Sequence, residues 1–194
     1  MKKLLCLLLA FALCFSFVAC GEKEVAEEAA AEKLVIGYTI YEPMNYMEDG
    51  KLTGFDTEFA EAVCEKLGVE PEFVISDWDN KFRELEAKSI DCIWNGMTIS
   101  NEALKNASVS KPYVKNAQVV VMNKDAAAKY ADAESMADLS FAVESGSAGA
   151  SAAEENGFAD VVEVGTQTDA LLEVKSGSCD ACIIDLTMAN AMVK

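Results

Sequence analysis

The chain has 194 residues, enough for one ordinary domain or two small lobes, and its 33 acidic and 16 basic side chains give a formal net charge of −17. This charge repels phosphate backbones and excludes nucleic acid as a partner. The sequence has no histidine and a single arginine, Arg83, which excludes Ser-His-Asp and Cys-His catalysis, His-ligated zinc and most guanidinium clamps on anions.

The N-terminal region has the pattern of a secretory signal. Basic Lys2 and Lys3 precede a largely apolar stretch over residues 4–19, which is shorter than the roughly 20 residues that span a bilayer as a helix. The stretch ends in FVACG, which resembles a bacterial lipobox whose cysteine is lipidated. We predict a signal peptide over residues 1–19 and a lipid anchor at Cys20, with ordinary secretion as the alternative. Residues 20–33 are rich in Ala and Glu and are predicted to form an acidic tether.

Four cysteines follow the predicted anchor, and we expect them to pack in the core. Cys64 lies in a helical pattern, and Cys92 and Cys182 lie in apolar strand patterns, where a thiol behaves as a small hydrophobe. Cys179 and Cys182 have the spacing of a redox or metal motif, but they enter a predicted strand, where positions i and i+3 face opposite sides. No metal site and no cofactor are therefore predicted, and the redox state of this pair is left open.

From residue 34 onward, strand and helix patterns alternate. The first series has predicted strands over 34–38, 72–76, 90–94 and 117–122, and helices over 55–67 and 79–88. The first helix has an apolar stripe consisting of Phe55, Phe59, Ala62, Val63 and Leu67. In the second helix, Phe82 and Leu85 are predicted to face inward and Arg83 to face solvent.

A second series begins near residue 141. Its predicted strands cover 141–143, 161–164 and 181–184, and its helices cover 147–156, 167–176 and a segment from residue 186. Strands that alternate with helices of about ten residues indicate parallel-rich sheets flanked by helices, an α/β fold. The two series predict two lobes, which we place at residues 34–120 and 121–194.

Ligands of such sheets bind at the carboxyl ends of the strands. The segments at those ends carry an aromatic face, hydroxyl groups, bare backbone amides and one carboxylate, supplied by Tyr41, Asn95, Gly96, Thr98, Ser147 and Asp185. These groups suit a small polar ligand, and they include no nucleophile and base that could act together. The pattern therefore favours binding over catalysis.

Several segments taken together resemble a known family. They are IYEPMNY (40–46), GKLTGFDTEFAEAVCEKLG (50–68), WDN (78–80) to SIDCIWNGMTIS (89–100), SKPY (110–113), ESGSAG (144–149) and GSCDACIID (177–185). They resemble the type II periplasmic solute-binding proteins of ABC importers, in the polar amino-acid branch, also called bacterial extracellular solute-binding protein family 3. The resemblance covers residues 34–194 and implies two α/β lobes, joined by crossing strands, that close on a ligand.

The resemblance also assigns roles to single residues. It implies that Tyr41 and Trp78 are aromatic walls, that the Gly96 carbonyl and Asp185 hold an α-ammonium group, and that Thr98 and Ser147 hold an α-carboxylate. Asn95 is expected to recognise a polar side chain. The alternatives are core packing for Tyr41 and Trp78, and helix capping for Thr98 and Asp185.

Two departures from the family pattern bear on the ligand and on the fold. Ala103 stands where the family carries an arginine that binds the ligand carboxylate. That carboxylate would then have to be held by amides and hydroxyls or by a lysine such as Lys105. The other alternative is a ligand that is not an ordinary α-amino acid. Family members also return to the first lobe after the second. This sequence stops at Lys194, so we expect a fragment or a truncated product whose incomplete first lobe exposes apolar surface.

The sequence therefore predicts an extracytoplasmic binding lipoprotein of an ABC importer. It would be a monomer, lipid-anchored in the periplasm or at the outer face of the cell membrane. We expect it to capture an amino acid or similar small polar solute by lobe closure and to dock on the permease subunits, whose identity the sequence leaves open. The alternatives are a ligand-sensing module for a membrane receptor and a cyclohexadienyl-dehydratase-like enzyme.

Overall fold

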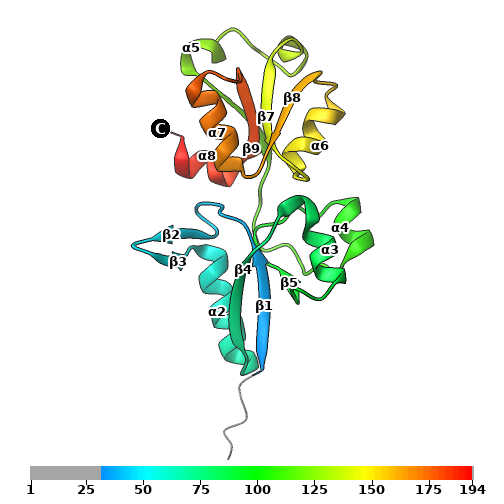
Figure 1. The fold of residues 1–194 in the computed structure, drawn as a ribbon. Helices are drawn as coiled ribbons and strands as arrows, with labels where there is room; N and C mark the ends of the chain where they lie inside the picture. Colours follow the sequence, from blue (N-terminus) through cyan, green and yellow to red (C-terminus); the bar gives the residue numbers. More distant parts are fainter. Residues whose placement is uncertain (1–31, 194) are drawn as a thin grey trace, which may run out of the picture. The chain divides into compact units, whose positions relative to one another are not determined.

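The computed structural model describes residues 32–193 and shows two parallel-rich α/β sheets, as predicted (Figure 1). The predicted signal peptide over residues 1–19, Cys20 and nearly all of the predicted tether lie outside these residues. Within residues 32–193, none of the helices is both long enough and apolar enough to cross a membrane.

The first sheet has three parallel strands in the order β4-β1-β5, and with its helices it forms the first lobe. The strands are β1 (Lys33–Tyr38), β4 (Glu70–Ile75) and the short β5 (Cys92–Ile93). Between β1 and β4 the chain forms an antiparallel hairpin of β2 (Tyr46–Glu48) and β3 (Lys51–Thr53), followed by α2 (Phe55–Leu67), which packs on β4. Helix α2 has the bounds that the sequence predicted.

The buried side of α2 differs from the predicted apolar stripe. Its buried residues are Asp56, Thr57, Ala60 and Cys64, whereas Phe55 is 50% exposed and Leu67 is 65% exposed. The small side chains allow the helix to pack closely on the sheet, and the larger apolar ones are turned away from it. The stripe therefore lies largely on the surface of the first lobe.

The segment after β4 is more broken than predicted. A 3-10 turn η1 (Trp78–Asn80) leads directly into α3 (Lys81–Glu86), and α4 (Asn101–Asn106) follows β5. The buried residue of α3 is Lys81, while Phe82 and Leu85 are half-buried and Arg83 is exposed, as predicted for Arg83.

The second sheet has four strands in the order β6-β9-β7-β8 and forms the second lobe with its helices (Figure 1). The strands are β6 (Gln118–Met122), β7 (Ser140–Glu144), β8 (Asp160–Val164) and β9 (Ala181–Asp185). β7 is parallel to both β8 and β9, whereas β6 pairs antiparallel with β9 over its whole length. The run over 117–122, which the sequence placed in the first series, thus belongs to the second sheet, because its valines pair beside the fully buried β9.

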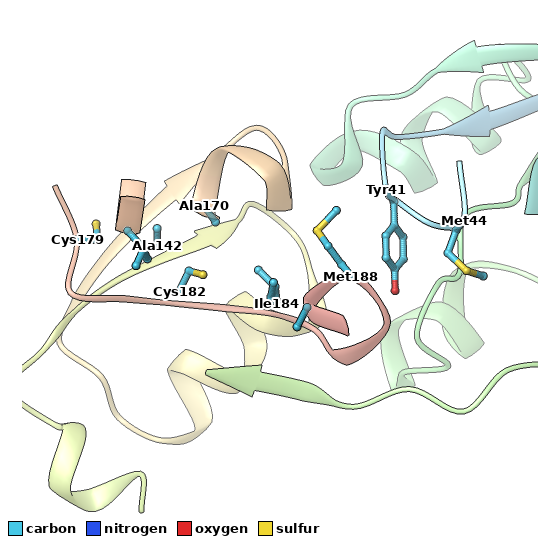
Figure 2. Close-up of a cluster of buried hydrophobic side chains, with 10 residues drawn as sticks. Tyr41, Met44, Ala142, Ala170, Cys179, Cys182, Ile184 and Met188 are labelled. Carbon is cyan, nitrogen blue, oxygen red and sulfur yellow. The ribbon is translucent and has the colours of Figure 1, made fainter. Parts of the chain in front are cut away.

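Helices pack on this sheet and form its core. These are α6 (Ala148–Glu155), α7 (Gln167–Ser176) and α8 (Leu186–Met192), and the shorter α5 (Lys124–Ala127) and η2 (Glu134–Met136) lie between β6 and β7. One buried cluster contains the stacked rings of Phe141 and Phe158, whose centroids lie 4.1 Å apart. A second cluster contains Cys182, Ile184 and Met188 together with Tyr41 and Met44 of the first lobe (Figure 2).

The cysteines of the described residues pack in the core, as predicted. Cys64, Cys179 and Cys182 are buried, Cys92 is half-buried, and all four are free thiols. Cys179 and Cys182 belong to the same buried cluster, because Cys179 precedes β9 and the alternation of faces along a strand does not apply to it. Within residues 32–193, no group of three His, Cys, Asp or Glu side chains could hold a metal ion.

Candidate functional site

A cavity of about 50 Å³ is lined by loops from both lobes and contains every residue that the sequence singled out for ligand binding. The first lobe supplies Tyr41, Trp78, Asn95, Gly96 and Thr98, and the second supplies Ser147 and Asp185. In this structure the space is large enough for only a few water molecules. The cavity therefore matches the polar end of a small ligand better than a large one.

Tyr41 is a rigid wall of this cavity. Its hydroxyl group forms a hydrogen bond with Thr187 Oγ1, and its ring belongs to the same buried cluster as Met188 (Figure 2). Burial and the nearby Asp185 carboxylate raise the pKa of the Tyr41 phenol, so the phenol stays neutral at physiological pH. The ring thus contributes both to packing and to the cavity wall, and the two readings of the sequence are compatible.

Trp78 is buried and forms another part of the wall. It begins η1, whose N-cap Asp77 accepts a hydrogen bond from the Asp79 amide. The Nζ atom of Lys81 lies 4.8 Å from the centroid of the Trp78 ring, a distance at which a cation is attracted by an aromatic face. One face of this ring is therefore already occupied by a cation from the same chain.

Asn95 is held in place by its own lobe. Its amide nitrogen donates to the Thr39 carbonyl oxygen at 2.9 Å and to Asn45 Oδ1 at 2.7 Å, and its amide oxygen accepts from Thr39 Oγ1 at 2.7 Å. Both amide protons are thus taken by neighbours, which leaves the side chain little capacity for a ligand. This geometry favours a structural role in fixing the loop that carries Gly96.

Gly96 lies in the left-handed region with φ at +61°. A Cβ atom at this position would lie 3.0 Å from Tyr41 Cε1, so a side chain would strain the backbone and crowd the aromatic wall. Behind it is Asp56, which is fully buried. Burial raises the pKa of the Asp56 carboxyl, and Tyr113, the Gly96 backbone and Trp94 partly offset this effect.

Thr98 is exposed at the mouth of the cavity, and it does not cap a helix. The N-cap of α4 is Ser100, whose hydroxyl oxygen accepts a hydrogen bond from the Ala103 amide at 3.1 Å. The alternative interpretation of Thr98 as an N-cap is therefore wrong. Its hydroxyl group stays available to a ligand.

Ser147 is the N-cap of α6. Its hydroxyl oxygen accepts a hydrogen bond from the Ala150 amide at 3.1 Å, and it lines the cavity from the second lobe. The first turn of α6 has no acidic side chain, and an N-cap position at the start of a helix has a positive potential. The position suits an anionic group of a ligand.

Asp185 is a buried carboxylate held by amide groups. Its oxygens accept hydrogen bonds from Asn116 Nδ2, from Gln118 Nε2 at 2.7 Å and from Gln167 Nε2 at 2.6 Å. Asp185 occupies the N-cap position of α8, as the alternative interpretation expected, but its side chain makes no capping hydrogen bond. Since all three donors are neutral, the negative charge of Asp185 has no cation beside it among these partners.

The structure adds charged residues to the cavity that sequence reasoning missed. Glu144 and Lys81 are both buried, and Glu102 also lines the cavity. Burial and the neighbouring Asp185 raise the pKa of the Glu144 carboxyl to about 7. The sequence signal for Glu144 was its place at the end of a predicted strand, whereas for Lys81 the only signal was its closeness to Trp78.

The positions that were considered for binding a carboxylate are not equally placed. Ala103 is buried in the cavity wall and offers only a methyl group. Lys105, which we considered as a replacement for arginine, is exposed and does not line the cavity. Arg83 is also exposed and outside it. Of the three sites, none brings a cation to the ligand.

A larger groove of about 1030 Å³ runs along the first lobe. It is lined by the apolar side of α2 and by the chain over residues 108–118, including Phe59, Leu67, Trp94 and Tyr113. The rings of Phe59 and Tyr113 lie 5.5 Å apart edge to face, and those of Phe59 and Trp94 lie 5.3 Å apart. The groove is an exposed apolar surface, at which Leu67 is 65% exposed.

The family model of the bacterial extracellular solute-binding proteins, family 3, matches residues 34–173 of the chain. The chain belongs to this family. It is similar to the arginine-binding extracellular protein ArtP of Bacillus subtilis (strain 168), with 32% identity over 205 residues that cover 100% of this chain and 77% of ArtP. A shorter match to the L-cystine-binding protein TcyJ of Escherichia coli (strain K12) is 42% identical and covers 38% of this chain and 28% of TcyJ.

Solved structures agree with this assignment. The arginine-bound form of truncated ArgBP from T. maritima matches with a TM-score of 0.79 and 32% identity, over 83% of this chain and 77% of that one. The ancestral amino acid-binding protein AncCDT-1, a precursor of cyclohexadienyl dehydratase, matches with a TM-score of 0.78 and 32% identity, over 82% of this chain and 72% of that one. The predicted two-lobed fold and the predicted family are thus confirmed, and the family is one of extracellular solute-binding proteins.

Proposed function

We propose that this protein binds an amino acid with a positively charged side chain and delivers it to an ABC importer. The observation that carries the proposal is the charge of the cavity, which is lined by the buried carboxyl groups of Glu144 and Asp185 and by the exposed Glu102, whereas Lys81 is the one cation among the described residues that line it. Buried carboxylates are costly unless a cation compensates them. A cationic ligand would supply that compensation.

The backbone-like end of the amino acid would be held by the residues that the sequence assigned. Its α-ammonium group would contact Asp185 and the Gly96 carbonyl, and its α-carboxylate would contact Thr98 and Ser147. Tyr41 and Trp78 would enclose the apolar part of the ligand. The exposed hydroxyl of Thr98 and the N-cap position of Ser147 support these roles.

Glu144 would select the cationic side chain. It is 3% exposed and lies near Asp185, and both effects disfavour its ionised form by raising its pKa. A guanidinium or ammonium group beside it would favour the ionised form and gain a charge-assisted hydrogen bond. The names of ArtP, which is called arginine-binding, and of the arginine-bound ArgBP agree with this choice.

Binding would be coupled to closure of the two lobes, the second of which begins with β6 at Gln118 rather than at residue 121 as the sequence predicted. The cavity takes its lining from both lobes, so a ligand reaches its full set of contacts only when the lobes meet. It then stabilises the closed form by its differential affinity, and the closed form would dock on the permease. We also propose that Cys20 anchors the protein in the membrane as a monomer, which membrane fractionation of Cys20→Ala would test.

We propose that the protein does not transform its ligand. In the described residues, the Ser100 and Ser147 hydroxyl groups of the cavity accept hydrogen bonds from backbone amides, and neither is hydrogen-bonded to a basic side chain. Because the chain is similar to the precursor of a dehydratase, this proposal needs a direct test. Assays with prephenate and arogenate would detect any dehydration. A pull-down with the permease would separate transport from a role as a receptor-bound sensor.

Calorimetric titration with arginine, lysine, histidine, glutamine, glutamate and leucine tests the ligand class. We expect heat from the cationic amino acids and at least about tenfold weaker binding of glutamine and glutamate. Glu144→Gln should reduce this preference without abolishing binding, whereas Glu154→Gln on α6, outside the cavity, should leave it unchanged. Tightest binding of glutamate would contradict the proposal.

A further inference from the structure

Lys81 is a buried cation whose ammonium group lies in the candidate ligand cavity. It is 5% exposed, and it occupies the first position of α3, directly after Trp78 and its turn. Its Nζ atom donates a hydrogen bond to the Trp78 carbonyl oxygen at 2.8 Å and another to the Gly146 carbonyl oxygen at 2.9 Å. Gly146 belongs to the second lobe, so this side chain contacts both lobes at the cavity.

The charge of Lys81 has no carboxylate partner in the described part of the chain. Over residues 32–193, the one ion pair within 4.0 Å joins Lys33 to Glu72 on the exposed surface. Two of the three Nζ protons are bonded to neutral carbonyl oxygens, and one remains free. Burying a cation without an anion is unfavourable, so a ligand anion beside the free Nζ proton of Lys81 would be favoured.

Aromatic contacts explain how the lysine is positioned but not why a charge is needed there. Nζ lies 4.8 Å from the Trp78 ring centroid and 5.0 Å from that of Phe82. Burial lowers the pKa of Lys81, and the carboxylates of Glu102, Asp79, Glu144 and Asp77 act in the opposite direction. A methionine could fill the same space against the two rings without the cost of burying a charge.

The surrounding residues leave Lys81 as the single cation available to a ligand anion. Among residues 32–193, no other lysine or arginine lines the cavity, and Ala103 contributes only a methyl group to its wall. The hydroxyl-bearing Thr98, Ser100, Ser147 and Ser151 line the same cavity. An ammonium group among hydroxyl groups is a suitable environment for a carboxylate.

We propose that Lys81 binds the α-carboxylate of the ligand and is the residue that makes the site specific for amino acids over the corresponding amines. This inference rests on the proposed function, because it assumes that an amino acid enters the cavity. On binding, the carboxylate takes the free Nζ proton, and the hydrogen bond to Gly146 keeps the second lobe beside it. Lys81 thus takes over the role that the family pattern gives to an arginine at position 103, which is Ala103 in this chain.

The test compares amino acids with their decarboxylated amines, arginine with agmatine and histidine with histamine, by calorimetric titration of the full chain. If the wild type binds arginine or histidine, it should bind that amino acid far more tightly than the corresponding amine. Lys81→Met should weaken binding of the amino acid by about 10- to 100-fold and that of the amine by less than about threefold. The preference for the carboxylate should thus largely disappear.

Two further variants separate a ligand contact from a structural role. Lys105→Met removes an exposed lysine outside the cavity, and it should leave all four titrations unchanged. Lys81→Arg keeps the charge and should retain most of the preference for the amino acid, even if its overall affinity drops. Circular dichroism and thermal melting of each variant show whether it is folded.

The outcomes distinguish this inference from the proposed function. If the folded Lys81→Met protein keeps the wild-type ratio of arginine to agmatine affinity, Lys81 does not bind the carboxylate and the inference is overturned, while the proposed function stands. The same holds if both affinities fall by an equal factor, which would indicate a latch between the lobes only. If none of the four compounds binds the wild type, both proposals fall together.

Discussion

Asn95 Nδ2 donates a 2.7 Å hydrogen bond to Asn45 Oδ1, and both side chains are almost completely buried. Asn45 in turn donates to Thr57 Oγ1 on α2 at 3.0 Å, and Asn95 also bonds to Thr39 after β1. The loop that carries Gly96 is therefore tied to two other parts of the first lobe by buried amide groups. Buried polar networks of this kind are rigid when every member is satisfied.

Replacing Asn95 by alanine should destabilise the protein strongly, because the buried groups of Thr39 and Asn45 would lose their partner. We expect the free energy of unfolding in urea to fall by about 2–3 kcal/mol. Asn156→Ala is the matched control, since that amide donates to the Ala152 carbonyl oxygen on the exposed side of α6 and its loss should cost less than about 1 kcal/mol. Equal losses in the two variants would contradict the role of the network.

Gly96→Ala should impair ligand binding in addition to stability. Gly157 also has a positive φ, +71°, but a Cβ atom there would meet open space. Both substitutions should lower stability by about 1 kcal/mol through backbone strain. Only Gly96→Ala should also reduce the affinity for the best-bound amino acid, because the added methyl group pushes against Tyr41. Calorimetric titration of both variants measures this difference in affinity. Unchanged affinity in Gly96→Ala would show that Tyr41 can move away from the added methyl group.

The buried Glu144 should make the empty protein less stable as the pH rises from about 4.5 to 7. Its pKa is about 7 in the folded chain, against 4.5 for an exposed glutamate. The folded state therefore holds a proton that the unfolded state releases in this window, and the contribution of Glu144 falls by about 3 kcal/mol across it.

Urea unfolding of the wild type and of Glu144→Gln at pH 5 and pH 8 measures this effect. Asp56, whose pKa is also raised by burial, contributes with the same sign to both proteins, so the difference between them reports on Glu144. The variant should lose less stability than the wild type on going to pH 8. Parallel pH profiles would mean that Glu144 is ionised in the folded chain.

The thiols of the buried Cys182 and the half-buried Cys92 should be unreactive while the protein is folded. Burial raises the pKa of Cys182 to about 12 and that of Cys92 to about 11, so the reactive thiolate form is rare near neutral pH. Peptide mapping after iodoacetamide treatment should show labelling of both residues only in urea. Rapid labelling of Cys182 in the native protein would indicate that β9 opens readily.

Local patterns predicted the elements well where the chain has clear start and stop signals. Helix α7 has the predicted bounds, because Thr166 caps its start through the Asp169 amide and Gly177 ends it in the left-handed conformation. Loop positions at strand ends pointed to Tyr41, Asn95, Gly96, Thr98, Ser147 and Asp185, which line one cavity in the structure. That result follows from the geometry of parallel sheets, which brings the carboxyl ends of strands together.

Contacts between distant segments could not be read from the same patterns. The apolar stripe of α2 is periodic, but periodicity does not tell which side of the helix packs on the sheet. In the structure, the buried side carries the small residues Ala60 and Cys64. Lys81 is missed for a related reason, since a lysine at the start of a helix is ordinarily exposed. Its burial depends on Trp78 and Gly146, which come together only in the folded chain.

Asp185 accepts hydrogen bonds from the segment that links the two lobes. Asn116 and Gln118 lie where the chain passes from the first lobe into β6 of the second, and both give their amide protons to this carboxylate. The same carboxylate therefore lines the cavity and holds the segment that links the two lobes. We expect Asp185→Asn to weaken the hydrogen bonds of this linking segment even when no solute is present.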